Sequence, residues 1–117
     1  DGYLHIVGRN KDLIISGGYN IYPKEIELVL DDQIGVLESA VIGVPDPDFG
    51  ETVLGVIVAE SGQSPDLDAM MDAIRSALAR FKHPRKLILL DELPRNTMGK
   101  VQKNILRGQY KDMFASS

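Results

Sequence analysis

The stretch Pro94-Arg95-Asn96-Thr97-Met98-Gly99-Lys100-Val101-Gln102-Lys103 lies between an apolar run and the last amphipathic run of the chain. It decides how the C-terminal third folds, because Pro94 and Gly99 mark a turn and Asn96 favours one. Lys100 is therefore expected near the tip of an ordered loop, where a compact charge on a long stem can reach anionic oxygens. On spacing alone, a solvated lysine at a turn is the simpler interpretation. The stretch is not a phosphate-binding P-loop, which needs glycine at position 94 and serine or threonine at position 101.

The segments on either side of this loop carry clear signals of secondary structure. Residues 85–90 form an apolar run that predicts a buried strand, and apolar positions after the loop predict a terminal helix. Before the strand, Ser64 is suited to cap a helix that has Pro65 in its first turn. The apolar positions of that helix follow helical spacing: Leu67, Met70, Met71, Ile74, Ala77, Leu78 and Phe81.

The N-terminal half predicts a hairpin, a helix and two longer strands. Residues 3–7 and 12–15 are strand candidates that form the hairpin, residues 16–20 form a turn, and a helix runs from Pro23 to about Asp32. Residues 38–44 and 52–59 are rich in β-branched side chains, and the run 45–48, with two prolines, ends the first of them. The order of elements predicts an α+β fold: a small β-hairpin plus a mostly antiparallel three-stranded sheet packed with helices.

Composition limits the possible functions. A chain of 117 residues, 44% hydrophobic and 26% charged, can form one domain with a modest core. The net charge of −4 argues against a nucleic-acid or membrane-surface protein, although cations gather in residues 80–111 and could form a local anion-binding face. We expect no metal site, because the chain lacks cysteine and His5 has no partner at metal-ligand spacing. No signal peptide or membrane span is visible, which predicts a cytoplasmic protein, and the start at Asp1 suggests a piece of a longer one.

Three stretches, read together, resemble the C-terminal domain of the adenylate-forming superfamily, which includes acyl-CoA synthetases, peptide-synthetase adenylation domains and luciferases. They are residues 8–27, with Gly-Arg-Asn-Lys-Asp and Ser-Gly-Gly-Tyr-Asn; residues 40–46, Ala-Val-Ile-Gly-Val-Pro-Asp; and the loop 94–103. The match covers essentially the whole chain in order. Within the superfamily, residues 95–104 and 110–112 look closest to bacterial malonyl-CoA synthetases.

The resemblance implies an enzyme of two half-reactions. A carboxylate and ATP give an acyl-adenylate and pyrophosphate, and the acyl group then passes to CoA with release of AMP. Residues 1–10 would end the large N-terminal adenylation domain, and residues 11–117 would form a small domain that swings on a hinge. ATP, Mg²⁺ and the carboxylic acid substrate would be bound mainly by that large domain, which would be the partner of this one. A fragment of this extent is therefore expected to be inactive alone.

The resemblance also implies roles for single residues. Lys100 matches the adenylation lysine that contacts the nucleotide, and Gly99 would keep the loop tip slim enough to enter a cleft. Arg9 matches the arginine at the nucleotide ribose, and Lys11 matches the hinge. The family's reversible lysine acetylation would make an acetyltransferase and a deacetylase further partners at Lys100, since acetylation removes its charge.

A second set of residues is implied in CoA binding. Gly17 and Gly18 match the loop lining the pantetheine tunnel, and Phe49 and Phe81 align with positions that sandwich the adenine in some members. The cations Lys82, His83, Arg85 and Lys86 could meet the phosphates. From the residues alone, the two glycines fit a tight turn and Phe81 fits a core position at a helix end. An alternative to the enzyme is a stand-alone nucleotide- or CoA-binding domain, or an adenylation subdomain that meets a carrier protein.

Overall fold

The computed structural model describes residues 13–47 and 50–114. The predicted strand 3–7 and the site candidates Arg9, Lys11 and Phe49 lie outside the described residues. Along the chain the elements are β1 (Ile14–Ser16), β2 (Tyr19–Ile21), α2 (Pro23–Asp31), β3 (Val36–Asp46), β4 (Gly50–Ala59), α3 (Leu67–Ala77), the 3₁₀ turn η2 (Arg80–Lys82), β5 (Lys86–Leu90) and α4 (Lys103–Tyr110).

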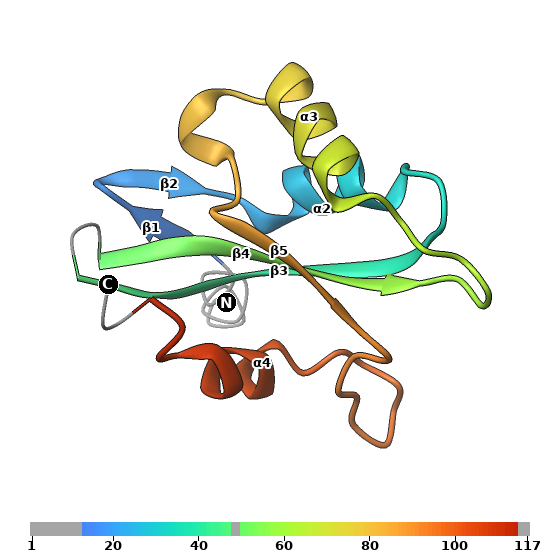
Figure 1. Ribbon diagram of the computed structural model, residues 1–117. Coiled ribbons are helices and arrows are strands. Elements are labelled where there is room, and N and C mark those ends of the chain that lie inside the picture. Colours follow the sequence, from blue (N-terminus) through green and yellow to red (C-terminus); the bar gives the residue numbers. More distant parts are fainter. Residues whose placement is uncertain (1–12, 48–49, 115–117) are drawn as a thin grey trace, which may run out of the picture.

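A five-stranded sheet organises the domain (Figure 1). β3 and β4 form a long antiparallel ladder from Val36↔Ala59 to Asp46↔Gly50, and β5 runs parallel to β4 on its other edge. The β1–β2 hairpin joins that edge through the single pair Ser16↔Gly50. A parallel partner requires a crossover connection, and α3 supplies it between β4 and β5. The predicted α+β fold, with a hairpin and a mostly antiparallel sheet packed with helices, is confirmed. The described hairpin pairs β1 with β2, whereas the predicted pairing of residues 3–7 with 12–15 lies largely outside the described residues.

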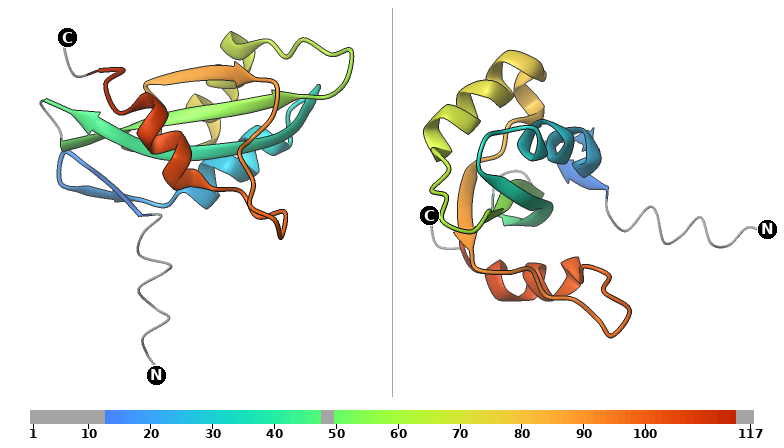
Figure 2. Two further views of the ribbon diagram at one scale, coloured as in Figure 1. Left: turned by 90° about the horizontal axis from the view of Figure 1, so that it is seen from below. Right: turned by 90° about the vertical axis from the view of Figure 1, so that its right-hand side faces the viewer.

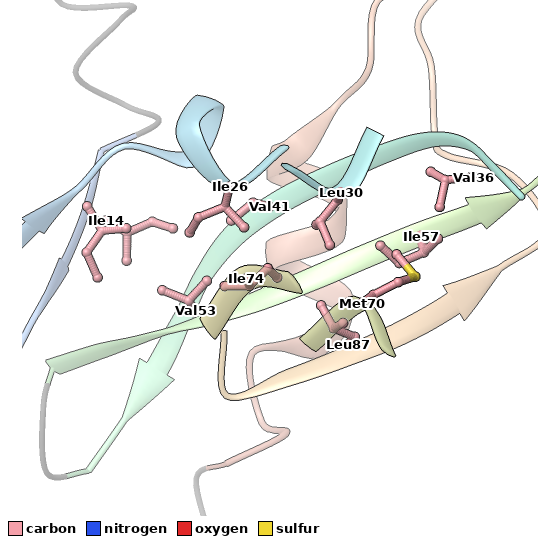
Figure 3. Packing of buried hydrophobic residues seen from close by; sticks show 11 residues of the cluster. Ile14, Ile26, Leu30, Val36, Val41, Val53, Ile57, Met70, Ile74 and Leu87 are labelled. Carbon is pink, nitrogen blue, oxygen red and sulfur yellow. The ribbon is translucent and has the colours of Figure 1, made fainter. Parts of the chain in front are cut away.

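The two faces of the sheet bury separate cores, because successive strand residues point to opposite sides. Val41, Val53 and Ile57 meet α2 and α3 on one face (Figure 3). Ile42, Leu54 and neighbouring apolar residues meet Leu106 of α4 on the other face. Figure 2 shows the resulting layers, with α3 and α4 on opposite sides of the sheet.

The helix starts follow from local chemistry, with one correction. Pro23 occupies the first turn of α2, as predicted. For α3 the predicted cap, Ser64, and the predicted first-turn position of Pro65 are wrong, because Asp66 is the N-cap and Pro65 precedes it. The Asp66 carboxylate accepts from the backbone N–H groups of Asp68 and Ala69 at 3.0 and 3.2 Å. Both residue types cap helices well, so composition alone cannot choose between positions two residues apart.

Several predicted boundaries also differ from the structure. The run 16–20 is not only a turn, because β2 starts at Tyr19. β3 continues through Pro45 to Asp46; a proline is tolerated in a strand that has an unpaired edge. α3 ends at Ala77, so Phe81 lies on η2, where it is 39% exposed and not part of a helix-end core. β5 is half-buried, with only Leu87 fully inside, because it lies at the rim of the sheet.

Side chains cover the outer edge of β3, on which the described residues place no further strand. The Val41 N–H donates to Glu27 Oε2 at 2.9 Å, and the same oxygen lies 2.7 Å from Lys103 Nζ. Ser39 donates its hydroxyl to Asp31 Oδ1 at 2.6 Å. An open strand edge can pair with another chain, so these contacts protect it, and they also tie α2 and α4 to the sheet.

Candidate functional site

The Lys100 loop is a narrow, hydrogen-bonded hairpin and not an open turn. Arg95 and Val101 form an antiparallel bridge at its base. The Asn96 N–H donates to the Lys100 carbonyl at 3.0 Å, and the Gly99 N–H donates to the Asn96 carbonyl at 2.9 Å. Backbone groups that bond across a loop fix its path, so the predicted ordered loop is confirmed.

The backbone of Lys100 is held on both sides by one residue. Asn96 Oδ1 accepts from the Lys100 N–H at 3.0 Å and from the Met98 N–H at 2.9 Å, while the Asn96 N–H binds the Lys100 carbonyl. Gly99 takes the left-handed conformation that closes the turn, with φ of +82°. A Cβ at Gly99 would meet nothing within 4 Å in the described chain, so conformation is the reason for glycine that this domain itself shows.

The side chain of Lys100 is exposed, and the described residues give it no salt-bridge partner. The two other cations of the loop each have a carboxylate partner. Arg95 pairs with Glu38 of β3, and Lys103 pairs with Glu27 of α2. Lys100 is therefore an available ammonium on a fixed backbone, a group that can stabilise negative charge brought to it by another molecule or domain.

A groove of about 970 Å³ lies beside the base of the loop. Its lining includes the carboxylates of Glu38, Asp91 and Glu92, and the Arg95 guanidinium already faces one of them. An acidic lining repels phosphates and carboxylates, so this groove does not suit ATP or CoA.

A second cluster unites residues far apart in sequence. Gly17 and Gly18, with φ of +58° and +86°, form the tip of the β1–β2 hairpin. Tyr19, directly after them, stacks on Phe81 of η2 with ring centroids 4.6 Å apart and planes at 21°. Lys82 Nζ lies 5.6 Å from the centroid of the Phe81 ring. Sequence reasoning missed Tyr19; the available signal was an aromatic residue following two glycines.

The basic residues beside this cluster are largely engaged within the domain. Lys82 Nζ lies 2.7 Å from Glu25 Oε1, and His83 Nε2 donates to the Leu78 carbonyl at 3.0 Å. The Arg85 guanidinium pairs with the buried carboxylate of Asp46 and sits 4.6 Å from the centroid of the Phe114 ring. Lys86 is exposed. The structure thus brings Gly17, Gly18, Phe81 and Lys82 together, and gives His83 and Arg85 structural contacts.

The two clusters lie at opposite ends of the molecule. Figures 1 and 2 show the β1–β2 hairpin at one end of the long β3–β4 ladder and the loop after β5 at the other.

Comparison with known proteins decides the family. The model of the AMP-binding enzyme C-terminal domain matches residues 25–100. The chain belongs to this family. This AMP-binding C-terminal domain contains Lys100 within its matched residues, whereas the β1–β2 hairpin precedes them.

Curated relatives of this AMP-binding C-terminal domain include CoA ligases. The chain is 47% identical over 110 residues to 3-[(3aS,4S,7aS)-7a-methyl-1,5-dioxo-octahydro-1H-inden-4-yl]propanoyl:CoA ligase of Rhodococcus jostii, covering 94% of this chain and 21% of the ligase. It is 44% identical to the long-chain-fatty-acid–CoA ligase FadD13 of Mycobacterium tuberculosis, covering 94% and 22%. Among solved structures, ATP-bound MatB from Rhodopseudomonas palustris matches with a TM-score of 0.87 and 54% identity, covering 90% of this chain and 21% of that one.

The AMP-binding C-terminal domain thus spans about a fifth of the length of the curated relatives it matches. Within residues 13–47 and 50–114, no group of three His, Asp or Glu side chains could hold a metal ion. In the same part of the chain, no helix has the length and apolar character needed to cross a membrane.

Proposed function

We propose that the chain is the mobile C-terminal domain of an AMP-forming acyl-CoA synthetase and supplies Lys100 to the adenylation step. The observation that carries the proposal is an exposed ammonium on a rigid loop whose other two cations are paired with carboxylates. A group that must enter a second domain needs a fixed backbone and a side chain without a competing partner in its own domain.

The chemistry of adenylation explains why a lysine is required. A carboxylate that attacks the α-phosphate of ATP brings two negative groups together, and the charge is most concentrated as the new bond forms. The Lys100 ammonium would lie between them and lower that repulsion most in the transition state. Arg9 would contact the nucleotide ribose, and Lys11 would be the hinge. ATP and Mg²⁺ would be held mainly by the large domain.

The second half-reaction would use the other end of the domain. Gly17 and Gly18 would line the path of the pantetheine arm, since side chains there would narrow it, and a Cβ at Gly18 would stand in open space. The Tyr19–Phe81 pair, together with Phe49, would offer aromatic surface to the adenine. Lys82, His83, Arg85 and Lys86 would meet phosphates, Arg85 only with the part of its side chain that Asp46 leaves exposed.

The acyl substrate is proposed as malonate or a related short- to medium-chain acid, in a cytoplasmic enzyme. The support is the resemblance of residues 95–104 to malonyl-CoA synthetases. A screen of dicarboxylates against fatty acids on the full-length synthetase tests it. Preference for long-chain acids would exclude malonate.

The role of Lys100 is tested in the same full-length enzyme. Lys100→Ala should reduce pyrophosphate release from ATP and acid to a small residual rate, yet leave transfer from a supplied acyl-adenylate to CoA largely intact. Enzymatic acetylation of Lys100 should act like the substitution, because it removes the charge. Adenylation by Lys100→Ala at the wild-type rate would exclude this role.

The alternative of a stand-alone CoA- or nucleotide-binding domain has one observation in its favour: the Tyr19–Phe81 pair is complete within this chain. Calorimetry on the 117-residue chain separates the two functions. Tight binding of CoA or ATP by the chain alone favours the alternative, whereas the synthetase domain should bind weakly because its sites are shared with another domain.

A further inference from the structure

Arg95 links the tip of the Lys100 loop to the sheet. Its guanidinium donates from Nη1 to the Gly99 carbonyl at 2.8 Å, and Nη2 pairs with Glu38 Oε1. Gly99 immediately precedes Lys100, and Glu38 belongs to β3, the long strand that carries both cores. One planar side chain therefore joins the tip of the loop to the rigid sheet.

The geometry of arginine suits such a link. Its five donors are fixed in a plane, so contacts at two nitrogens define both distance and angle, which a flexible lysine could not do. The backbone bonds of Asn96 hold the loop together internally but do not set its angle to the sheet. At the other end of the loop, the Lys103–Glu27 pair provides a comparable tie. Together these two ion pairs set the angle at which the loop leaves the domain.

We propose that Arg95 is a positioning residue for adenylation, acting on Lys100 through the Gly99 carbonyl and Glu38. This inference rests on the proposed role of Lys100. Arg95 itself touches no substrate in this scheme. Its loss would let the loop tilt, and displacement of a catalytic group by about 1 Å can cost roughly 100-fold in rate.

A double-substitution experiment in the full-length synthetase separates positioning from direct contact. Arg95→Ala, Lys100→Ala and the double variant are compared in single-turnover adenylation and in transfer from supplied acyl-adenylate. Arg95→Ala should slow adenylation by roughly 10- to 100-fold and leave transfer unchanged. The double variant should be no slower than Lys100→Ala, because a positioning residue has nothing left to position.

Two milder variants protect the experiment against misfolding. Glu38→Gln keeps an oxygen acceptor for Arg95, and Arg95→Lys keeps the charge without the planar fork; both should give smaller losses than Arg95→Ala. Arg75→Ala is the matched control, since Arg75 forms an exposed ion pair with Asp72 on α3. Amide hydrogen exchange of peptides covering residues 95–102 should rise in Arg95→Ala and not in Arg75→Ala.

The outcomes distinguish the inference from the proposed function. Wild-type adenylation by Arg95→Ala, equal loss of both half-reactions, or a further loss in the double variant would each overturn the positioning role. Wild-type adenylation by Lys100→Ala would instead overturn the function assigned to the lysine. Loss with Lys100→Ala but none with Arg95→Ala would remove only the inference.

Discussion

Glu27 and Lys103 link the two helical layers around the edge of the sheet. Glu27 Oε2 lies 2.7 Å from Lys103 Nζ and also accepts the Val41 N–H at 2.9 Å. Both side chains are mostly buried, with 14% and 17% of their surface exposed. One carboxylate thus connects α2, β3 and the start of α4.

We expect Lys103→Met to lower the free energy of unfolding by about 1–3 kcal/mol, because it leaves the Glu27 carboxylate mostly buried without its cation. Urea unfolding measures this change. An unchanged slope of the free energy of unfolding against urea concentration would show that two-state behaviour is kept. Arg75→Ala, which breaks an exposed pair, should cost less than about 1 kcal/mol. If Lys103→Met lowered the free energy of unfolding no more than this control, the Glu27–Lys103 pair would contribute little to stability.

We expect Arg85 to contribute more to the stability of the domain than to the binding of CoA. Its guanidinium compensates the fully buried Asp46 carboxylate, so Arg85→Ala should lower the free energy of unfolding by about 1–3 kcal/mol, less than for a fully buried pair because Arg85 is itself 41% exposed. The KM for CoA should change less than in Lys86→Ala, whose side chain is exposed. A large rise in the KM for CoA with unchanged stability would favour a direct phosphate contact.

Substitutions in the Tyr19–Phe81 pair should affect the thioester-forming step alone. Phe81→Ala or Tyr19→Ala should raise the KM for CoA by about 10-fold, since stacking of a base on an aromatic ring contributes roughly 1–3 kcal/mol. Adenylation should not change. Tyr19→Phe is the matched control, because it keeps the ring and removes only the hydroxyl. An unchanged KM in Phe81→Ala would place the adenine elsewhere.

Substitutions at Gly99 distinguish two reasons for a glycine there: its left-handed backbone conformation and its lack of a side chain. Alanine at φ of +82° is strained by about 1–2 kcal/mol, whereas asparagine tolerates the left-handed region better. Gly99→Ala should therefore slow single-turnover adenylation more than Gly99→Asn. The reverse order would mean that the loop tip must be slim, as the sequence resemblance suggested, and that its backbone geometry is secondary.

Local sequence signals were sufficient to predict those helices and strands whose formation depends mainly on their own residues. Pro23 and the spacing of Ile26 and Leu30 predict α2, and the β-branched runs predict β3 and β4, because periodic burial decides these elements. The turn around Gly99 was equally readable. In contrast, β2 was missed because two glycines dominated the interpretation of the segment, while its pairing with β1 depends on the hairpin as a whole.

Contacts between distant residues were not accessible in the same way. Asp46 and Arg85 lie 39 positions apart, and Arg95 and Glu38 lie 57 apart, and nothing in either local sequence specifies the partner. The basic composition of residues 80–111 suggested an anion-binding face. In the folded domain several of these cations face carboxylates, so the number of charges overstated what is available to a ligand.

The placement of the glycine hairpin and the lysine loop at opposite ends of one sheet has a kinetic consequence (Figure 1). In the synthetase proposed above, a rigid rotation of this domain that brings one end to the shared active site would move the other end away from it. In a synthetase built this way, the thiol could not be admitted while the ammonium was still in place. The rigid rotation would then fix the order of the two half-reactions. A more viscous solvent should slow the rotation between them without changing the rate of either chemical step.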